Sequence, residues 1–100
     1  MTKSVLTSYS VATSKYSSRQ GYSPRRFILH HTAGGGNQGN INLLAHNTSY
    51  SVSCNYLSLT TGEIVNIVPE EYRAWTTGWN ADRDSITQET VNSGGAPGWP

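Results

Sequence analysis

The sequence predicts a single small domain of the α/β class. One hundred residues leave room for one domain at most. Four segments carry the short apolar or alternating runs that are typical of strands, and one segment between them spaces its apolar residues as a helix does. Three Trp and six Tyr are too many for a disordered linker, so we expect a packed core.

The first predicted strand covers residues 26–31 and ends in two histidines. The apolar run Phe27-Ile28-Leu29 has the size of a buried strand end, and His30 and His31 follow it directly. The glycines at 34–36 then stop the strand. The histidines therefore lie where a strand meets a loop, a common place for binding and catalytic side chains.

The segments on either side of this strand differ in character. Residues 1–25 are polar with sparse apolar positions, so we expect an irregular arm that packs on a domain formed by residues 26–100. Residues 40–47 predict a short helix that begins at Asn40 as its N-cap. Three apolar side chains share one face of that helix: Ile41, Leu44 and Ala45.

A hairpin and a further strand complete the predicted sheet. Residues 52–59 and 64–68 are strands joined by a turn that contains a glycine. Pro69 ends the second strand, because it has no N–H for the ladder, and it can start one helical turn over 69–73. Residues 86–92 alternate enough to form another strand.

Composition narrows the class of function. The formal net charge is +1 and only 13% of residues are charged, which argues against a nucleic-acid binder. No apolar run approaches the roughly 20 residues of a membrane span, and the N-terminus has no secretory signal. The turn-rich end at residues 96–100 leads us to expect an N-terminal fragment of a longer domain.

The two histidines are the first candidates for chemistry. Neighbours on a strand point to opposite faces, so at most one of them faces a given cleft. Neutral imidazole is a common zinc ligand, and our hypothesis is that His30 binds zinc; the alternative is one histidine in the core and one ordinary polar histidine. A zinc site needs three or four ligands, and His30, His31, His46, Cys54 and the carboxylates show no short ligand motif.

Glu89 is the carboxylate that we expect to be buried, because β-prone residues surround it. A buried carboxylate has a raised pKa and can serve as a general base or acid, whereas the alternative is a residue that faces solvent on the strand. The remaining acidic residues lie in predicted turns, where we expect them to be solvated: Glu63, Glu70, Glu71, Asp82 and Asp84.

Three further side chains have two interpretations each. Cys54 could be a nucleophile that works with His30, or a small buried hydrophobic residue. Trp75 and Trp79 flank the sequence Thr-Thr-Gly and could stack on a sugar or peptide, or cover the core.

Four segments, in order, resemble the zinc-dependent N-acetylmuramoyl-L-alanine amidases of phage endolysins, which share the peptidoglycan-recognition-protein fold. They lie within roughly residues 26–92: Phe27-Ile28-Leu29-His30-His31-Thr32-Ala33, Ser53-Cys54-Asn55-Tyr56-Leu57 with Thr61-Gly62-Glu63-Ile64, Val68 to Gly78, and Asp84 to Asn92. The resemblance implies a mixed central β-sheet flanked by helices, incomplete at its C-terminal end.

The resemblance also implies a reaction and its site. His30 would be the first zinc ligand and Glu89 the catalytic base, with Thr32, Trp75 and Thr76 binding substrate. Zinc-activated water would hydrolyse the amide between N-acetylmuramic acid and L-alanine in bacterial peptidoglycan. An endolysin would stay in the host cytoplasm until its release to the cell wall, with no membrane insertion and no nucleic-acid partner.

The chain also departs from the family pattern. Asn55 and Thr76 stand where the family often has His, and Cys54 stands where some members have a catalytic Tyr. No segment matches the one that carries the family's other two zinc ligands. The alternative function is therefore a peptidoglycan-binding module on the same fold that does not hydrolyse its ligand.

Overall fold

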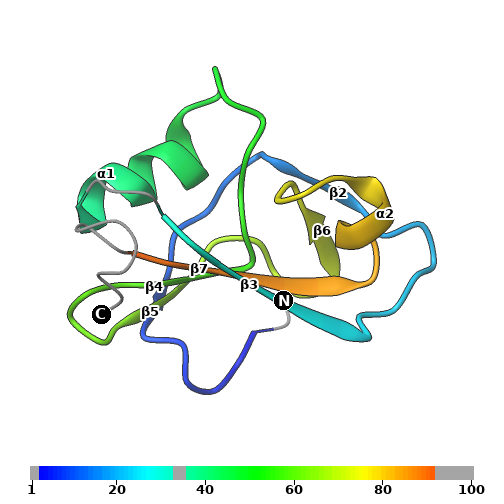
Figure 1. Ribbon diagram of the computed structural model, residues 1–100, viewed down its shortest axis with the longest axis horizontal. Helices are drawn as coiled ribbons and strands as arrows, with labels where there is room; N and C mark the ends of the chain where they lie inside the picture. The colour runs from blue at the N-terminus through cyan, green and yellow to red at the C-terminus, as the bar shows by residue number, and fades with distance from the viewer. Residues whose placement is uncertain (1–2, 33–35, 92–100) are drawn as a thin grey trace.

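The computed structural model describes residues 3–32 and 36–91 and centres on a five-stranded mixed sheet with strand order β1-β5-β4-β7-β3 (Figure 1). Its strands are β1 (Tyr9–Ser10), β3 (Arg26–His31), β4 (Tyr56–Ser58), β5 (Ile64–Asn66) and β7 (Ser85–Thr90). A separate antiparallel ribbon pairs β2 (Tyr16–Ser18) with β6 (Tyr72–Ala74). The helices are α1 (Asn37–Ile41), a π-helix η1 (Asn42–His46) and α2 (Trp79–Asp82). The predicted α/β class with a mixed central sheet is confirmed.

Strand β7 holds the sheet together, because it pairs in parallel with β3 on one side and with β4 on the other. The predicted hairpin is confirmed as the antiparallel pair β4–β5, and Gly62 in its turn has a φ of 91°. One row of neighbours crosses the sheet from His30 through Glu89 to Leu57. Neighbours in a row project to the same face, so both site candidates share the face of a core leucine.

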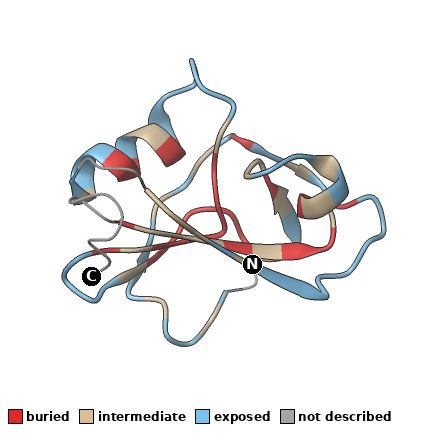
Figure 2. Ribbon diagram, in the orientation of Figure 1, coloured by how far each residue is buried: buried red, intermediate tan, exposed pale blue. Residues whose placement is uncertain are grey.

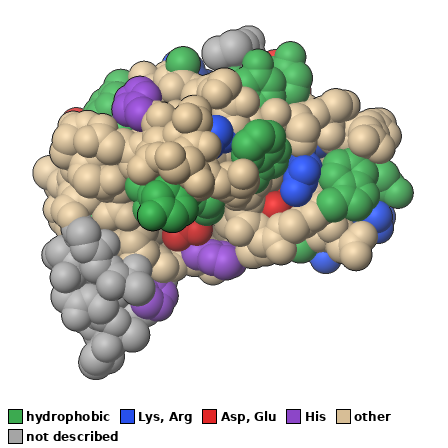
Figure 3. All heavy atoms as spheres, turned by 90° about the horizontal axis from the view of Figure 1, so that it is seen from above, with side chains coloured by type: hydrophobic (Ala, Val, Ile, Leu, Met, Phe, Trp, Pro, Cys, Tyr) green, Lys and Arg blue, Asp and Glu red, His purple; other side chains and the backbone are tan. Residues whose placement is uncertain are grey.

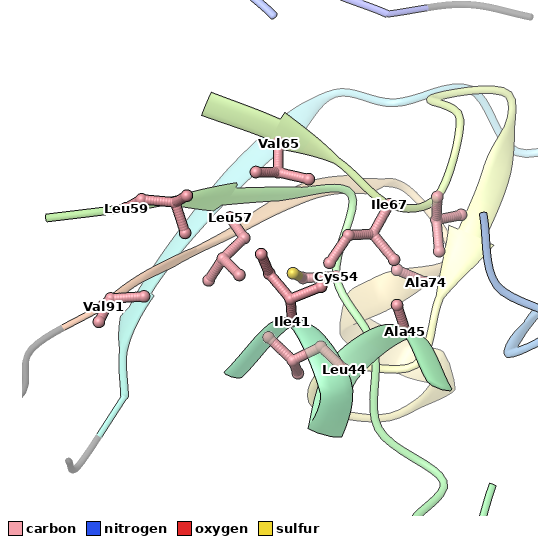
Figure 4. Close-up of a cluster of buried hydrophobic side chains, with 11 residues drawn as sticks. Ile41, Leu44, Ala45, Cys54, Leu57, Leu59, Val65, Ile67, Ala74 and Val91 are labelled. Carbon is pink, nitrogen blue, oxygen red and sulfur yellow. The ribbon is translucent and has the colours of Figure 1, made fainter. Parts of the chain in front are cut away.

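The core lies on that face of the sheet, beneath α1 and η1 (Figures 2 and 4). The predicted apolar helix face of Ile41, Leu44 and Ala45 is confirmed, since all three side chains are buried. The full cluster consists of Ile41, Leu44, Ala45, Cys54, Leu57, Leu59, Val65, Ile67, Val68, Ala74 and Val91. In Figure 1, α1 lies above one end of the sheet and α2 with the β2–β6 ribbon lies above the other end.

The N-terminal arm is more regular than the sequence predicted. Strand β1 pairs with β5, and β2 pairs with β6, so residues before 26 add a strand to each sheet. Lys15 is buried, and its ammonium donates to the carbonyl oxygens of Leu43, Asn47 and Tyr50 at 2.7, 3.0 and 3.1 Å. The expectation of an irregular arm was wrong, whereas the boundary between residues 25 and 26 stays a prediction.

Two local predictions about helices were also wrong. The first helix begins at Asn37 with Gly36 as its N-cap, and Asn40 lies inside it with its amide donating to Gly36 O. No helical turn forms over 69–73, because Tyr72–Ala74 pairs with β2 instead.

Within residues 3–32 and 36–91, every helix is too short or too polar to cross a membrane.

Candidate functional site

The site begins with an imidazole and a carboxylate on neighbouring parallel strands. His30 on β3 and Glu89 on β7 are register partners, and His30 Nδ1 lies 3.7 Å from Glu89 Oε2. The His30 side chain is 39% exposed and that of Glu89 is 12% exposed. His31 belongs to the opposite face by alternation, and its Nδ1 lies 3.1 Å from Thr32 O. The sequence therefore separated the two histidines correctly, but their chemical roles stay predictions.

Burial sets the protonation chemistry of Glu89. Its pKa is raised above the ordinary value, chiefly because burial penalises the charged carboxylate, while His30 and His31 pull it back down. The carboxylate lies beside Leu57, which is fully buried in the core. A carboxyl group with a raised pKa, reachable from solvent through a small opening, is suited to exchanging protons with a bound ligand.

Two other carboxylates are more deeply buried than Glu89, so the expectation that they are solvated was wrong. Asp84 is 3% exposed and pairs with Arg25 and Arg26, whose bonds hold its pKa below the usual value. Asp82 is fully buried, and its carboxylate accepts hydrogen bonds from backbone N–H groups. Arg25 and Arg26 lie nearly sixty residues before Asp84 in the sequence, so no local pattern revealed the burial of Asp84, and none revealed that of Asp82.

A cavity of about 310 Å³ opens next to the loop between β6 and α2, lined by Ser51, Arg73, Trp75, Thr76 and Gly78. Both residues predicted to bind substrate in this loop, Trp75 and Thr76, form its wall. Trp79 does not line it; its ring packs edge-on to Tyr22, with centroids 6.0 Å apart. The family resemblance had already included Arg73, in the segment from Val68 to Gly78, whereas sequence reasoning missed Ser51 as a wall residue.

Hydrogen bonds connect the cavity wall to the Glu89 strand. Thr76 Oγ1 lies 2.8 Å from Ser53 O and 2.8 Å from Thr87 Oγ1. Thr87 precedes Glu89 by two residues and projects to the same face, about 7 Å along the strand. The cavity therefore lies beside the strand that carries Glu89.

The third residue predicted to bind substrate, Thr32, follows β3 directly. Its N–H donates to Thr90 O at 2.9 Å, which extends the β3–β7 pairing by one residue past His31. Thr32 therefore lies one residue beyond the strand end and two residues from His30.

Figure 3, seen from the helix side of the sheet, shows histidine and acidic side chains in contact at the surface, with hydrophobic side chains beside them.

Cys54 does not fit the role of nucleophile. Its side chain is 0% exposed and belongs to the hydrophobic core, and burial raises its pKa well above the usual range. A thiol attacks as the thiolate, and this environment suppresses the thiolate. The interpretation of Cys54 as a small buried hydrophobic residue is the one that its position supports.

The described part of the chain does not assemble a complete metal site. Across residues 3–32 and 36–91, no three His, Cys, Asp or Glu side chains are grouped so that they could hold an ion. Glu89 Oε2 lies 3.7 Å from His30 Nδ1, and His46 is exposed at the end of η1. Zinc needs three or four protein ligands, so these residues alone do not fit it.

Comparison with known proteins places this geometry in a family. The model of the N-acetylmuramoyl-L-alanine amidase family matches residues 20–100. The chain therefore belongs to the N-acetylmuramoyl-L-alanine amidase family. No curated protein matches it.

Two solved structures share the fold. The crystal structure of a selenomethionine AmpD derivative matches with a TM-score of 0.74 and 21% identity, covering 89% of this chain and 63% of that one. A mutant structure of PlyL matches with a TM-score of 0.59 and 19% identity, covering 78% of this chain and 52% of that one. The chain thus spans about half to two thirds of the length of these two structures.

Proposed function

We propose that this chain is part of a peptidoglycan hydrolase that cleaves the amide bond between N-acetylmuramic acid and L-alanine. One observation carries the proposal: a mostly buried carboxylate with a raised pKa, Glu89, lies 3.7 Å from His30 on the neighbouring parallel strand. Membership in the amidase family supplies the reaction class. The cavity walled by Trp75 and Thr76 lies beside β7, the strand of Glu89, and suits a glycan–peptide junction.

Glu89 has the properties of a base that later becomes an acid. As a water oxygen attacks the amide carbonyl carbon, the carboxylate takes the proton from that water. When the C–N bond breaks, the same carboxyl gives the proton to the departing amine of L-alanine. The products are the free carboxylic acid on the muramic acid and a free amino group on the peptide.

We propose that the substrate is held on both sides of this carboxylate. Trp75 presents an aromatic wall, and its Nε1–H donates to Ser17 Oγ at 3.2 Å, which fixes the indole. Thr76, whose hydroxyl is bonded to Ser53 O and Thr87 Oγ1, forms the wall toward one end of the His30–Glu89 pair, and Thr32 lies beyond the other end. Hydroxyl and aromatic groups together are suited to a sugar that carries a peptide.

Zinc dependence is a further part of the proposal, with His30 as one ligand. Family membership and the partly exposed position of His30 beside Glu89 support it. The described residues bring no second and third ligand to His30, so a complete site would need ligands beyond those that they assemble. An endolysin of phage origin, released from the host cytoplasm to the cell wall, stays a prediction from the resemblance.

The lack of a three-ligand group among the described residues favours the alternative function. Because the described residues hold no three-ligand group, a peptidoglycan-binding module without hydrolysis is the second candidate. Both functions use the cavity beside Thr76, and they differ in whether a bond is broken.

The experiment that separates them is incubation of the protein with purified insoluble peptidoglycan. The bound fraction is measured by co-sedimentation, and new N-terminal alanine is measured by amine labelling of the digest. The proposed hydrolase binds and releases new alanine amines in proportion to time. Binding without new amines would support the binding module, and absence of both would contradict the two functions together.

A further inference from the structure

We propose that Asp82 is a positioning residue for the substrate cavity, holding its wall at a fixed place beside the Glu89 strand. The inference rests on the proposed function, because it concerns how the same cavity receives peptidoglycan. Asp82 is the last residue of α2 and its side chain is fully buried. It therefore acts through the residues that it holds rather than by touching the substrate.

The carboxylate of Asp82 accepts hydrogen bonds from the backbone N–H groups of three successive residues. Those of Thr76 and Gly78 donate to Oδ2, each at 2.8 Å, and that of Thr77 reaches both oxygens at 2.9 and 3.0 Å. The hydroxyl of Thr77 adds a bond to Oδ1 at 2.9 Å. Hydrogen bonds to an ionised acceptor are about twice as strong as neutral ones, so this one side chain fixes the whole turn.

Most of the cavity wall touches this carboxylate. Of the five lining residues, Thr76 and Gly78 donate their N–H groups to it, and Arg73 has Nη2 at 3.9 Å from Oδ2. Gly78 has a φ of 117°, a conformation that other residues rarely adopt, and it holds the turn in the shape that aims these N–H groups inward. Asp82 thus gathers three wall residues around one charge.

The held turn in turn positions the wall against the sheet. Thr76 is the residue whose Oγ1 lies 2.8 Å from Thr87 Oγ1, on the strand and face of Glu89. Its neighbour Trp75 donates its N–H to Ser53 Oγ at 3.0 Å. If the hydrogen bonds from the turn to the Asp82 carboxylate are lost, the Trp75 indole and the Thr76 hydroxyl are no longer held at fixed positions relative to Glu89.

The test compares Asp82→Asn with Asp84→Asn. The amide at 82 keeps the size of the side chain but removes the charge and turns an acceptor into a donor that faces N–H groups. Asp84 is a matched control, because it is buried to a similar degree and its partners Arg25 and Arg26 do not line the cavity. Both variants are assayed well below their melting temperatures.

Three measurements are made on wild type and both variants: KM and kcat on solubilised peptidoglycan, binding to the insoluble polymer, and backbone amide exchange. For Asp82→Asn we expect KM to rise about tenfold, the factor for one lost charge-assisted contact, while kcat stays within about twofold. Exchange should accelerate at the amides of Thr76, Thr77 and Gly78. For Asp84→Asn we expect an unchanged KM and unchanged exchange at those three amides.

The outcomes separate this inference from the function on which it rests. Equal effects of both variants on KM, or unchanged exchange in Asp82→Asn, would overturn the positioning role while wild-type hydrolysis stands. If the wild type binds without cleaving, the affinity for insoluble peptidoglycan replaces KM and must show the same difference between variants. A wild type that neither binds nor cleaves contradicts the proposed function, and the substrate role of Asp82 falls with it.

Discussion

Replacing Lys15 by Met tests how the N-terminal arm is tied to the helical layer. Lys15 is 3% exposed, and its ammonium donates to the carbonyl oxygens of Leu43, Asn47 and Tyr50, the first of which lies in η1. These bonds join residue 15 to a segment about thirty positions later in the chain. Methionine retains most of the apolar volume of the side chain and removes all three donors.

The size of the effect follows from the three contacts. Hydrogen bonds from a charged donor are worth about 1.5–3 kcal/mol each, so the gross contribution is about 4–9 kcal/mol. The cost of burying the ammonium offsets several kcal/mol of this gain. We therefore expect Lys15→Met to lower the free energy of unfolding by about 3 kcal/mol, a large share of the 5–15 kcal/mol that is typical of a domain.

Urea unfolding followed by tryptophan fluorescence measures this change, with Lys3→Met as the control. Lys3 is exposed and donates to Ser10 Oγ at the surface, so its replacement should leave stability within about 0.5 kcal/mol of wild type. At about 4–8 °C per kcal/mol, the Lys15 variant should melt about 12–24 °C lower. A Lys15→Met protein as stable as the Lys3 control would refute the claim that this lysine ties the arm down.

Two further predictions concern the site. His30→Ala should remove protein-bound zinc, measured by elemental analysis of the purified protein. His46→Ala is the control and should keep its zinc, because His46 is exposed at the end of η1. Equal zinc in the wild type and both variants would rule out His30 as a ligand. The folded-state pKa of Glu89 is raised above 4.5, so the contribution of this carboxyl group to wild-type stability is lost as the pH rises through the folded-state pKa. Glutamine does not titrate, so the urea midpoint of Glu89→Gln should rise relative to that of the wild type above pH 4.5. A difference between the two midpoints that does not change with pH would contradict the burial of Glu89.

Local patterns in the sequence predicted most of the sheet and one side of the site. The run Phe27–Leu29, the hairpin and the strand around Glu89 each carry their own signal, because apolar periodicity and turn glycines act over a few residues. Alternation along one strand was enough to separate His30 from His31. The contact between His30 and Glu89, however, depends on the parallel pairing of two distant strands, which no local pattern encodes.

The errors arose where hydrogen bonds formed in the fold override local preference. Residues 69–73 have a proline that could begin a helix, but Tyr72–Ala74 pairs with β2, a distant segment of the chain. Asp82 resembles a solvated turn residue, yet the turn of Thr76–Gly78, four to six residues earlier, folds back on it and buries it. The first partner is distant in the sequence, and the second depends on the shape of the turn, which the residue types alone do not reveal.

If Glu89 moves the proton during amide hydrolysis, replacing it by glutamine must remove hydrolysis and leave binding intact. Glutamine keeps the shape of the side chain but has no carboxylate to take a proton. The measurement is the rate at which new N-terminal alanine appears from purified peptidoglycan, alongside co-sedimentation with the same polymer. We expect Glu89→Gln to bind as the wild type does and to lose activity by a factor of about 100 or more, the usual contribution of a general base. Turnover equal to that of the wild type would show that Glu89 does not move the proton.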